Sequence, residues 1–140
     1  MAVRIVGGEE SNAYYKELEL LIKREGLTKQ CFLKGITNNV QGVLEEGDIF
    51  AFPSAYEGFG MALAEGMSMG LPSVGFKNCP GVNELIADKQ NGLLCDDGVD
   101  SFAGALETLM CDRSLRIKMG KEYTFQKDLQ ITLRLQGKKT

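Results

Sequence analysis

Short apolar runs alternate with amphipathic segments along this chain, a pattern that predicts strands alternating with helices. The first run, Val3–Val6, is rich in β-branched residues. Tyr15, Leu18 and Ile22 then recur at helical spacing, and Gly26 follows where a left-handed helix cap is expected. The further predicted strands are Cys31–Leu33, Asp48–Pro53, Pro72–Phe76 and Gly92–Cys95. The further predicted helices are a short one capped by Asn38-Asn39 and ending at Glu46, Met61–Met69, Ser101–Met110, Leu115–Met119 and a last one at about 124–136.

This alternation predicts an α/β fold, a doubly wound parallel sheet with helices on both faces. The length of 140 residues fits one domain, 1–140, with one core. Ligands of such sheets bind beyond the carboxyl ends of the strands. The loops expected there are Gly7–Gly8, Lys34–Thr37, Ser54–Gly60, Lys77–Asn83 and Asp96–Gly98.

Composition excludes several classes of function. A net charge of -3 gives no basic stripe for nucleic acid, and the absence of histidine excludes His-based triads and metalloprotease helices. No apolar run is long enough to span a membrane, and no signal peptide opens the chain. The cysteines are widely spaced, so we expect buried or incidental thiols in a reducing cytosol: Cys31, Cys79, Cys95 and Cys111.

The most informative segment is the predicted loop that opens the helix at Met61. Gly58 and Gly60 carry no side chains, so the amides of Phe59, Gly60 and Met61 can approach an anion at the positive end of the helix. We expect a diphosphate there.

Two carboxylates flank this loop and helix. The α-carbons of Glu57 and Glu65 should lie about 10 Å apart, from the rise of a helix. This is generous for a glycosidase pair, which spans roughly 5–10 Å, and suits two grips on the hydroxyls of an elongated ligand. The alternative is structural, since Gly-rich turns precede many helices and a Glu on a helix is usually solvated.

Together these residues resemble a known family. Glu57-Gly58-Phe59-Gly60 with Glu65, followed by Gly70-Leu71-Pro72, is similar to the E-x7-E segment of glycosyltransferase family 4, whose members are retaining enzymes of the GT-B fold. Further ordered matches are Arg4-Ile5-Val6-Gly7, Phe32-Leu33-Lys34-Gly35, Asp48 to Ser54, Gly81-Val82-Asn83-Glu84 with Ile86, Asn91-Gly92-Leu93-Leu94 and Met119-Gly120.

The resemblance implies roles for single residues. Glu65 would hold the ribose hydroxyls of the donor nucleotide, while Glu57, expected to be catalytic, and the amides of Gly58 to Gly60 with Met61 would address the donor. Backbone around Lys34 and Gly35 would line the base. Glu84 matches a family Glu, but a carboxylate at a helix start equally acts as a cap.

The resemblance also implies a reaction. A sugar would pass from a nucleotide diphosphate sugar to a glycan, lipid or small-molecule acceptor, with no cofactor and no metal. The chain resembles the Rossmann-like C-terminal domain of such an enzyme without its first strand and helix, which carry the phosphate-holding Arg and Lys, and without the N-terminal acceptor domain. We therefore expect an inactive isolated chain with unpaired strand edges that favour self-association.

Two departures and two rivals accompany this interpretation. Gly66 replaces the family's usual Ala at a cost in helix propensity, and Cys79-Pro80-Gly81 replaces a Gly-Gly pair near the donor sugar. The rivals are a GT-B nucleotide-sugar epimerase and a non-catalytic nucleotide-sugar-binding module. The expected location is the cytoplasm, with the full-length enzyme peripheral at the inner membrane face. Base, sugar and acceptor are left open.

Overall fold

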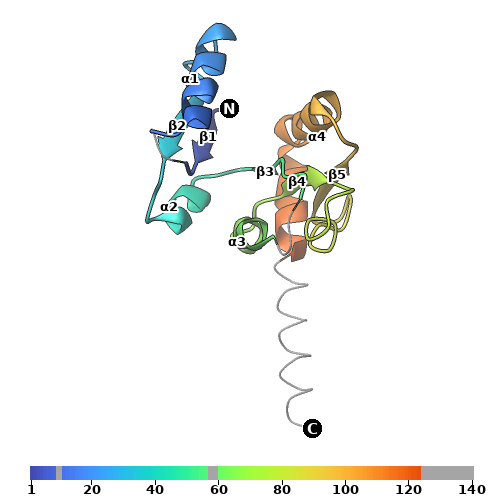
Figure 1. Ribbon diagram of the computed structural model, residues 1–140. Coiled ribbons are helices and arrows are strands. Elements are labelled where there is room, and N and C mark those ends of the chain that lie inside the picture. The colour runs from blue at the N-terminus through green and yellow to red at the C-terminus, as the bar shows by residue number, and fades with distance from the viewer. Residues whose placement is uncertain (9–10, 57–59, 124–140) are drawn as a thin grey trace. The chain divides into compact units, whose positions relative to one another are not determined.

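The computed structural model describes residues 1–8, 11–56 and 60–123 (Figure 1). The chain divides into two compact units, Met1–Gly42 (unit 1) and Val43–Thr140 (unit 2). Each is described by itself below. The expectation of a single domain over 1–140 stays a prediction, and the helix expected at about 124–136 lies outside the described residues.

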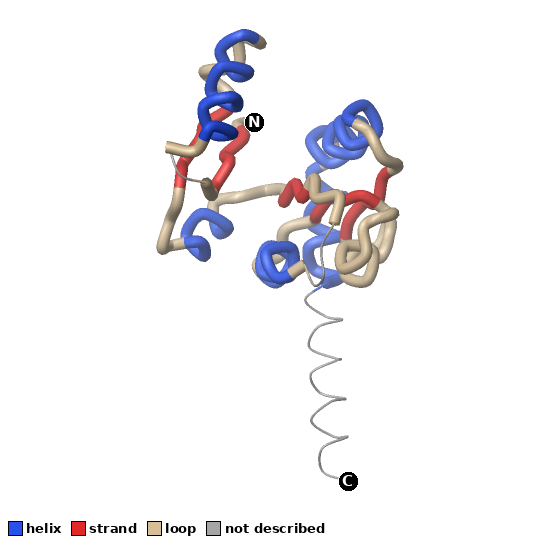
Figure 2. The backbone as a smooth tube through the Cα atoms, in the orientation of Figure 1, coloured by secondary structure: helices blue, strands red, loops and turns tan. Residues whose placement is uncertain are grey.

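Unit 1 pairs two parallel strands beside one helix (Figure 2). Strand β1 (Val3–Val6) pairs in register with β2 (Cys31–Gly35), with an irregularity between Ile5 and Val6. Helix α1 (Ala13–Arg24) begins after Asn12, whose side chain accepts a hydrogen bond from the amide of Tyr14. A six-residue helix, α2 (Val40–Glu45), spans the boundary between the units.

The contact of α1 with β2 includes a polar anchor. Tyr15 is buried, and its hydroxyl donates to the Leu33 carbonyl at 3.4 Å. This side-chain hydrogen bond joins α1 to the backbone of β2.

Unit 2 contains a three-stranded parallel sheet in the order β3-β4-β5. Its strands are β3 (Phe50–Phe52), β4 (Ser73–Phe76) and β5 (Gly92–Cys95). Its helices are α3 (Met61–Ser68), α4 (Val99–Cys111) and a further helix described over residues 113–123.

Two apolar clusters cover the two faces of this sheet. On one face, Leu63 and Met67 of α3 pack with buried residues of the segment after β4 and with the partly buried Phe50 and Phe52. On the other face, Val74 and Cys95 pack with α4 and with Met119. Burial of the apolar stripes of α3 and α4 against opposite faces stabilises a doubly wound arrangement.

The helix at 113–123 docks against the end of α3. Gly70 ends α3 with a φ of +80°, as the sequence predicts, and a Cβ on Gly120 would collide with the Gly70 carbonyl. The two backbones can approach only because Gly120 lacks a side chain, since a Cβ on Gly70 would meet nothing within 4 Å.

The α/β class with parallel strands is therefore confirmed, with the strands distributed over two small sheets. Most predicted elements are found within a few residues of their expected bounds. Among the described residues, β1 has only β2 as a neighbour and β3 only β4.

Close packing, rather than helix propensity, explains why a glycine occupies position 66. A Cβ on Gly66 would lie 2.7 Å from the ring of Phe50. We predict that Gly66→Ala lowers the free energy of unfolding by about 1–3 kcal/mol, because overpacking outweighs the ~1 kcal/mol of helix propensity that alanine returns. Denaturant unfolding of this chain measures the change.

The matched control is Gly104→Ala in α4, where a Cβ meets nothing within 4 Å. This substitution should stabilise the chain by about 0.5–1 kcal/mol. If both alanine variants were equally stabilised, the ring of Phe50 would not occupy the space over Gly66.

The thiols give a second test of the packing. Cys79 and Cys95 are buried, whereas Cys111 is exposed, and burial raises the pKa of the Cys95 thiol. We predict that iodoacetamide at neutral pH alkylates Cys111 first and leaves Cys79 and Cys95 protected until denaturant is added. Peptide mass spectrometry reads the order. Rapid native labelling of Cys95 would contradict the packing of β5 beneath α4.

Candidate functional site

The N-terminus of α3 stands beyond the carboxyl end of β3. Gly60 is its N-cap residue, is buried, and has no side chain with which to cap the helix. A Cβ at this position would lie 3.3 Å from the Gly81 carbonyl and 3.4 Å from a methyl of Leu85. Gly60 therefore gives the helix start open amides and, in addition, allows the segment after β4 to pack against it.

Helix α3 separates its apolar and polar positions. Leu63 and Met67 are fully buried against the sheet, while Met61 and Glu65 are exposed. Ser68 donates its hydroxyl to the Glu65 carbonyl at 2.7 Å, near the other end of the helix. The structure thus presents the Glu65 carboxylate to solvent on the helix whose N-terminus carries the expected anion site.

Three of the predicted site residues lie outside the described residues. They are Glu57, Gly58 and Phe59. Their predicted roles, including the catalytic role of Glu57, stay predictions.

The residues predicted to line the base lie in unit 1. The Lys34 ammonium stands 5.6 Å from the centre of the Phe32 ring, and the Gly35 carbonyl accepts a hydrogen bond from the Gly7 amide at 2.7 Å. The backbone carbonyl of Gly8 is also near Gly35, 4.0 Å from where a Cβ would stand. The structure therefore joins two of the predicted loops, those after β1 and after β2, through backbone contacts.

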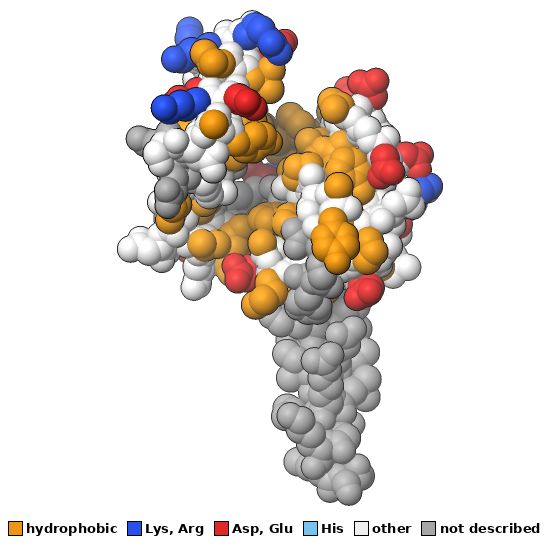
Figure 3. All heavy atoms as spheres, in the orientation of Figure 1, with side chains coloured by type: hydrophobic (Ala, Val, Ile, Leu, Met, Phe, Trp, Pro, Cys, Tyr) orange, Lys and Arg blue, Asp and Glu red, His pale blue; other side chains and the backbone are white. Residues whose placement is uncertain are grey.

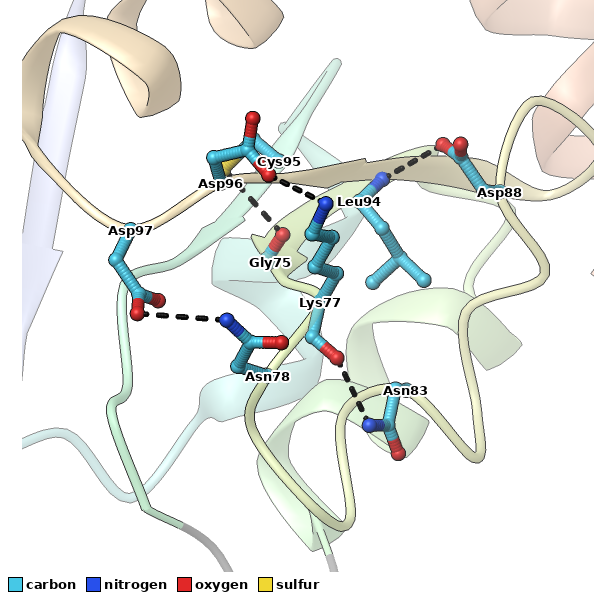
Figure 4. Close-up of polar contacts among 9 residues, drawn as sticks. All are labelled: Gly75, Lys77, Asn78, Asn83, Asp88, Leu94, Cys95, Asp96 and Asp97. Atoms are coloured by element: carbon cyan, nitrogen blue, oxygen red, sulfur yellow. Dashed lines mark hydrogen bonds and ion pairs between the residues drawn. The ribbon is translucent and has the colours of Figure 1, made fainter.

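The loops after β4 and β5 meet in a polar network that the sequence did not reveal (Figure 4). Lys77 pairs with Asp96 at 2.5 Å, Asn78 approaches Asp97 at 3.5 Å, and the Asn83 amide group donates to the Lys77 carbonyl at 2.8 Å. The predicted gathering of loops at the carboxyl ends of the strands is the only sequence signal that could have found it. Which side chains pair follows from the register of β4 with β5.

Electrostatically, this network is acidic around one cation. The hydrogen bond to Asp96 and its charge raise the pKa of Lys77, with Asp97 and Asp88 adding to the effect. Asp88 also accepts a hydrogen bond from the Leu94 amide at 2.9 Å, which ties the segment before β5 to the strand. The exposed side chain of Lys77 contacts Asp96 and is protonated at neutral pH.

The helix start considered for Glu84 is wrong. Residues 81–85 form consecutive turns, with the amides of Val82 and Ile86 donating to the carbonyls of Cys79 and Val82. Packing of Val82 and Ile86 onto the sheet fixes these turns, so Glu84 is an exposed turn residue and caps no helix.

Charge is distributed differently on the two units. Figure 3 shows Lys and Arg side chains over α1, whereas Asp and Glu predominate over the part of unit 2 that carries α4. No cluster of three or more potential metal ligands occurs among residues 1–8, 11–56 and 60–123. Within these same ranges, no helix is long and apolar enough to cross a membrane.

Comparison with known proteins finds relatives that match most of the chain. Residues 1–124 match the family described as glycosyl transferases group 1. An uncharacterized glycosyltransferase of Haemophilus influenzae is 31% identical over 118 residues, which are 84% of this chain and 33% of that protein. The Escherichia coli UDP-Gal:alpha-D-GlcNAc-diphosphoundecaprenol alpha-1,3-galactosyltransferase is 35% identical over 92 residues, 65% of this chain and 24% of that protein.

Solved structures share the fold. Anabaena HepE in complex with UDP-glucose superimposes with a TM-score of 0.80 at 27% identity, over 88% of this chain and 35% of that one. WaaG, a glycosyltransferase involved in lipopolysaccharide biosynthesis, has a TM-score of 0.79 at 19% identity, over 91% of this chain and 34% of that one. The matched part of this chain spans 33% and 24% of the lengths of the two curated relatives just named.

Proposed function

This chain belongs to the group 1 glycosyl transferases, and we propose that it forms the donor-binding part of a retaining enzyme that uses a nucleotide diphosphate sugar. The observation that carries the proposal is the arrangement on α3. An uncapped helix start at Gly60 and an exposed Glu65 further along the same helix offer an anion site and a hydroxyl grip on one rigid element.

In this proposal the two features hold different parts of the donor. The N-terminal amides of α3, including that of Met61, stabilise the diphosphate as negative charge develops on the leaving oxygen. Glu65 accepts hydrogen bonds from the two ribose hydroxyls. Glu57, carried over from the family resemblance, addresses the sugar, and the backbone at Lys34 and Gly35 lines the base. No divalent metal takes part.

Uracil is the base we propose. Structures that share the fold at 25–27% identity were solved with UDP or UDP-glucose, and the relative from Escherichia coli is named for UDP-Gal. The transferred sugar is a hexose in this proposal, and the acceptor, a glycan, a lipid or a small molecule, is chosen by a separate acceptor domain. The compartment we propose is the cytoplasm, with the whole enzyme peripheral at the inner face of the membrane.

The test is UDP binding by this 140-residue chain, with GDP and ADP as competitors. Saturation-transfer NMR should detect UDP, and Glu65→Gln should weaken it about tenfold or more, since a lost pair of charge-assisted hydrogen bonds costs about 1.5–3 kcal/mol. Glu107→Gln, which neutralises an exposed carboxylate on α4, is the matched control and should leave UDP binding unchanged.

Three results would count against the proposal. UDP signals equally insensitive to Glu65→Gln and Glu107→Gln would remove Glu65 from the site. Release of an epimerised sugar from the donor without any acceptor, by an enzyme that contains this chain, would favour the epimerase over the transferase. Donor binding with no transfer by that enzyme would favour a non-catalytic module.

A further inference from the structure

The segment after β4 folds back over the sheet and reaches the start of α3. It leaves the strand at Lys77 and passes through Cys79 and Gly81 to Asn83. This segment, residues 77–83, is called the β4 loop below. All of its residues, and α3 itself, lie in unit 2, so the contacts between them belong to one compact body.

Apolar side chains anchor the inner side of the β4 loop. Cys79 and Val82 are fully buried in the cluster that contains Leu63 and Met67 of α3. The loop therefore moves with α3 and the sheet, and little freedom is left at these two positions. Between them, Gly81 brings its carbonyl close to Gly60.

Polar contacts close the outer side of the β4 loop. The Asn83 side chain donates to the Lys77 carbonyl at 2.8 Å and so joins the last residue of the loop to the first (Figure 4). The Lys77 ammonium in turn holds Asp96 at the exit of β5. The Asn83 side chain thus adds a link between the two ends of the loop, within which the amides of Val82 and Asn83 also donate to the Cys79 carbonyl. The Lys77 amide donates to the Cys95 carbonyl and so joins the first residue of the loop to the sheet.

Gly81 of the β4 loop contacts Gly60 at the start of α3. The Gly81 carbonyl packs against Gly60, where even a Cβ would stand only 3.3 Å from it. Gly81 has a φ of +85°, in the left-handed region that favours glycine, so the orientation of this carbonyl depends on a residue without a side chain. If the loop widened, the Gly81 carbonyl would shift relative to the amides that follow Gly60.

We propose that Asn83 is a positioning residue for the donor site, which it controls by closing the β4 loop and so holding the Gly81 carbonyl against the start of α3. The inference rests on the proposed function for the role of α3, and it assigns no contact between Asn83 and the donor. Asn83 is exposed, and its contribution lies in the geometry of the loop rather than in the core.

The decisive variant is Asn83→Asp, which keeps the size of the side chain but replaces the donating amide with a carboxylate that only accepts. Asn83→Ala is the second variant, in case the carboxylate and the Lys77 carbonyl repel strongly enough to perturb folding. Thr108→Ala is the matched control, because it removes another exposed side-chain hydrogen bond in unit 2, from the Thr108 hydroxyl to the Gly104 carbonyl.

The first measurement is the amide spectrum of each labelled chain without ligand. Asn83→Asp and Asn83→Ala should shift the resonances of Gly60, Met61 and Gly81, whereas Thr108→Ala should leave these three unchanged. All three variants should keep the unfolding midpoint close to that of the unsubstituted chain. Unchanged Gly60 and Met61 resonances in both Asn83 variants would overturn the inference.

The second measurement is the affinity for UDP. Both Asn83 variants should weaken it about threefold to tenfold, the effect of one hydrogen bond of ordinary strength, and Thr108→Ala should not. Shifted amides with unchanged UDP affinity would overturn the donor-site role. If the unsubstituted chain bound no UDP at all, the proposed function would fail for this chain, and the amide spectra would still decide whether Asn83 positions the start of α3.

Discussion

The close approach of residues 79–86 to the sheet is the constraint on which the rest of unit 2 depends. A Cβ on Gly75 of β4 would collide with the side chain of Val82, so this segment lies directly on the strand only because position 75 has none. The same approach buries Val82 and Ile86 against α3. The sheet, residues 79–86 and α3 are therefore packed closely together, and the position of the start of α3 depends on the strand β4 beneath this segment.

The sequence predicts the bounds of helices and strands well where residues at the boundary itself determine them. Gly26 and Gly70 mark the ends of α1 and α3 because a left-handed residue is a property of the turn itself, and both have positive φ. Val3–Val6 and Gly92–Cys95 have the bounds that the sequence predicts because a short apolar run between turn residues is itself a local signal of a strand, although β1 is largely exposed in unit 1.

Long-range packing could not be predicted in the same way. From the sequence, Gly66 is only a residue of low helix propensity. The structure explains the glycine by the ring of Phe50, sixteen positions earlier in the chain, which occupies the space that a side chain at position 66 would need. Glu84 looked like a helix start, but the burial of Val82 bends this stretch into turns. For the site, the sequence predicts which loops follow the strands and singles out Glu65 on α3. The hydrogen bond from the Asn83 side chain to the Lys77 carbonyl could not be predicted, because its acceptor is a backbone atom that no side-chain pattern encodes.

Helix α3 is closely packed against other backbone segments at both ends. Its start meets the Gly81 carbonyl at Gly60, and the residue that ends it, Gly70, meets Gly120 of the helix at 113–123. A helix of eight residues is stiff over its length of about 12 Å. Backbone thus meets backbone near each end of α3, and at Gly60 and Gly120 no side chain is present that could adjust to a shift of the helix.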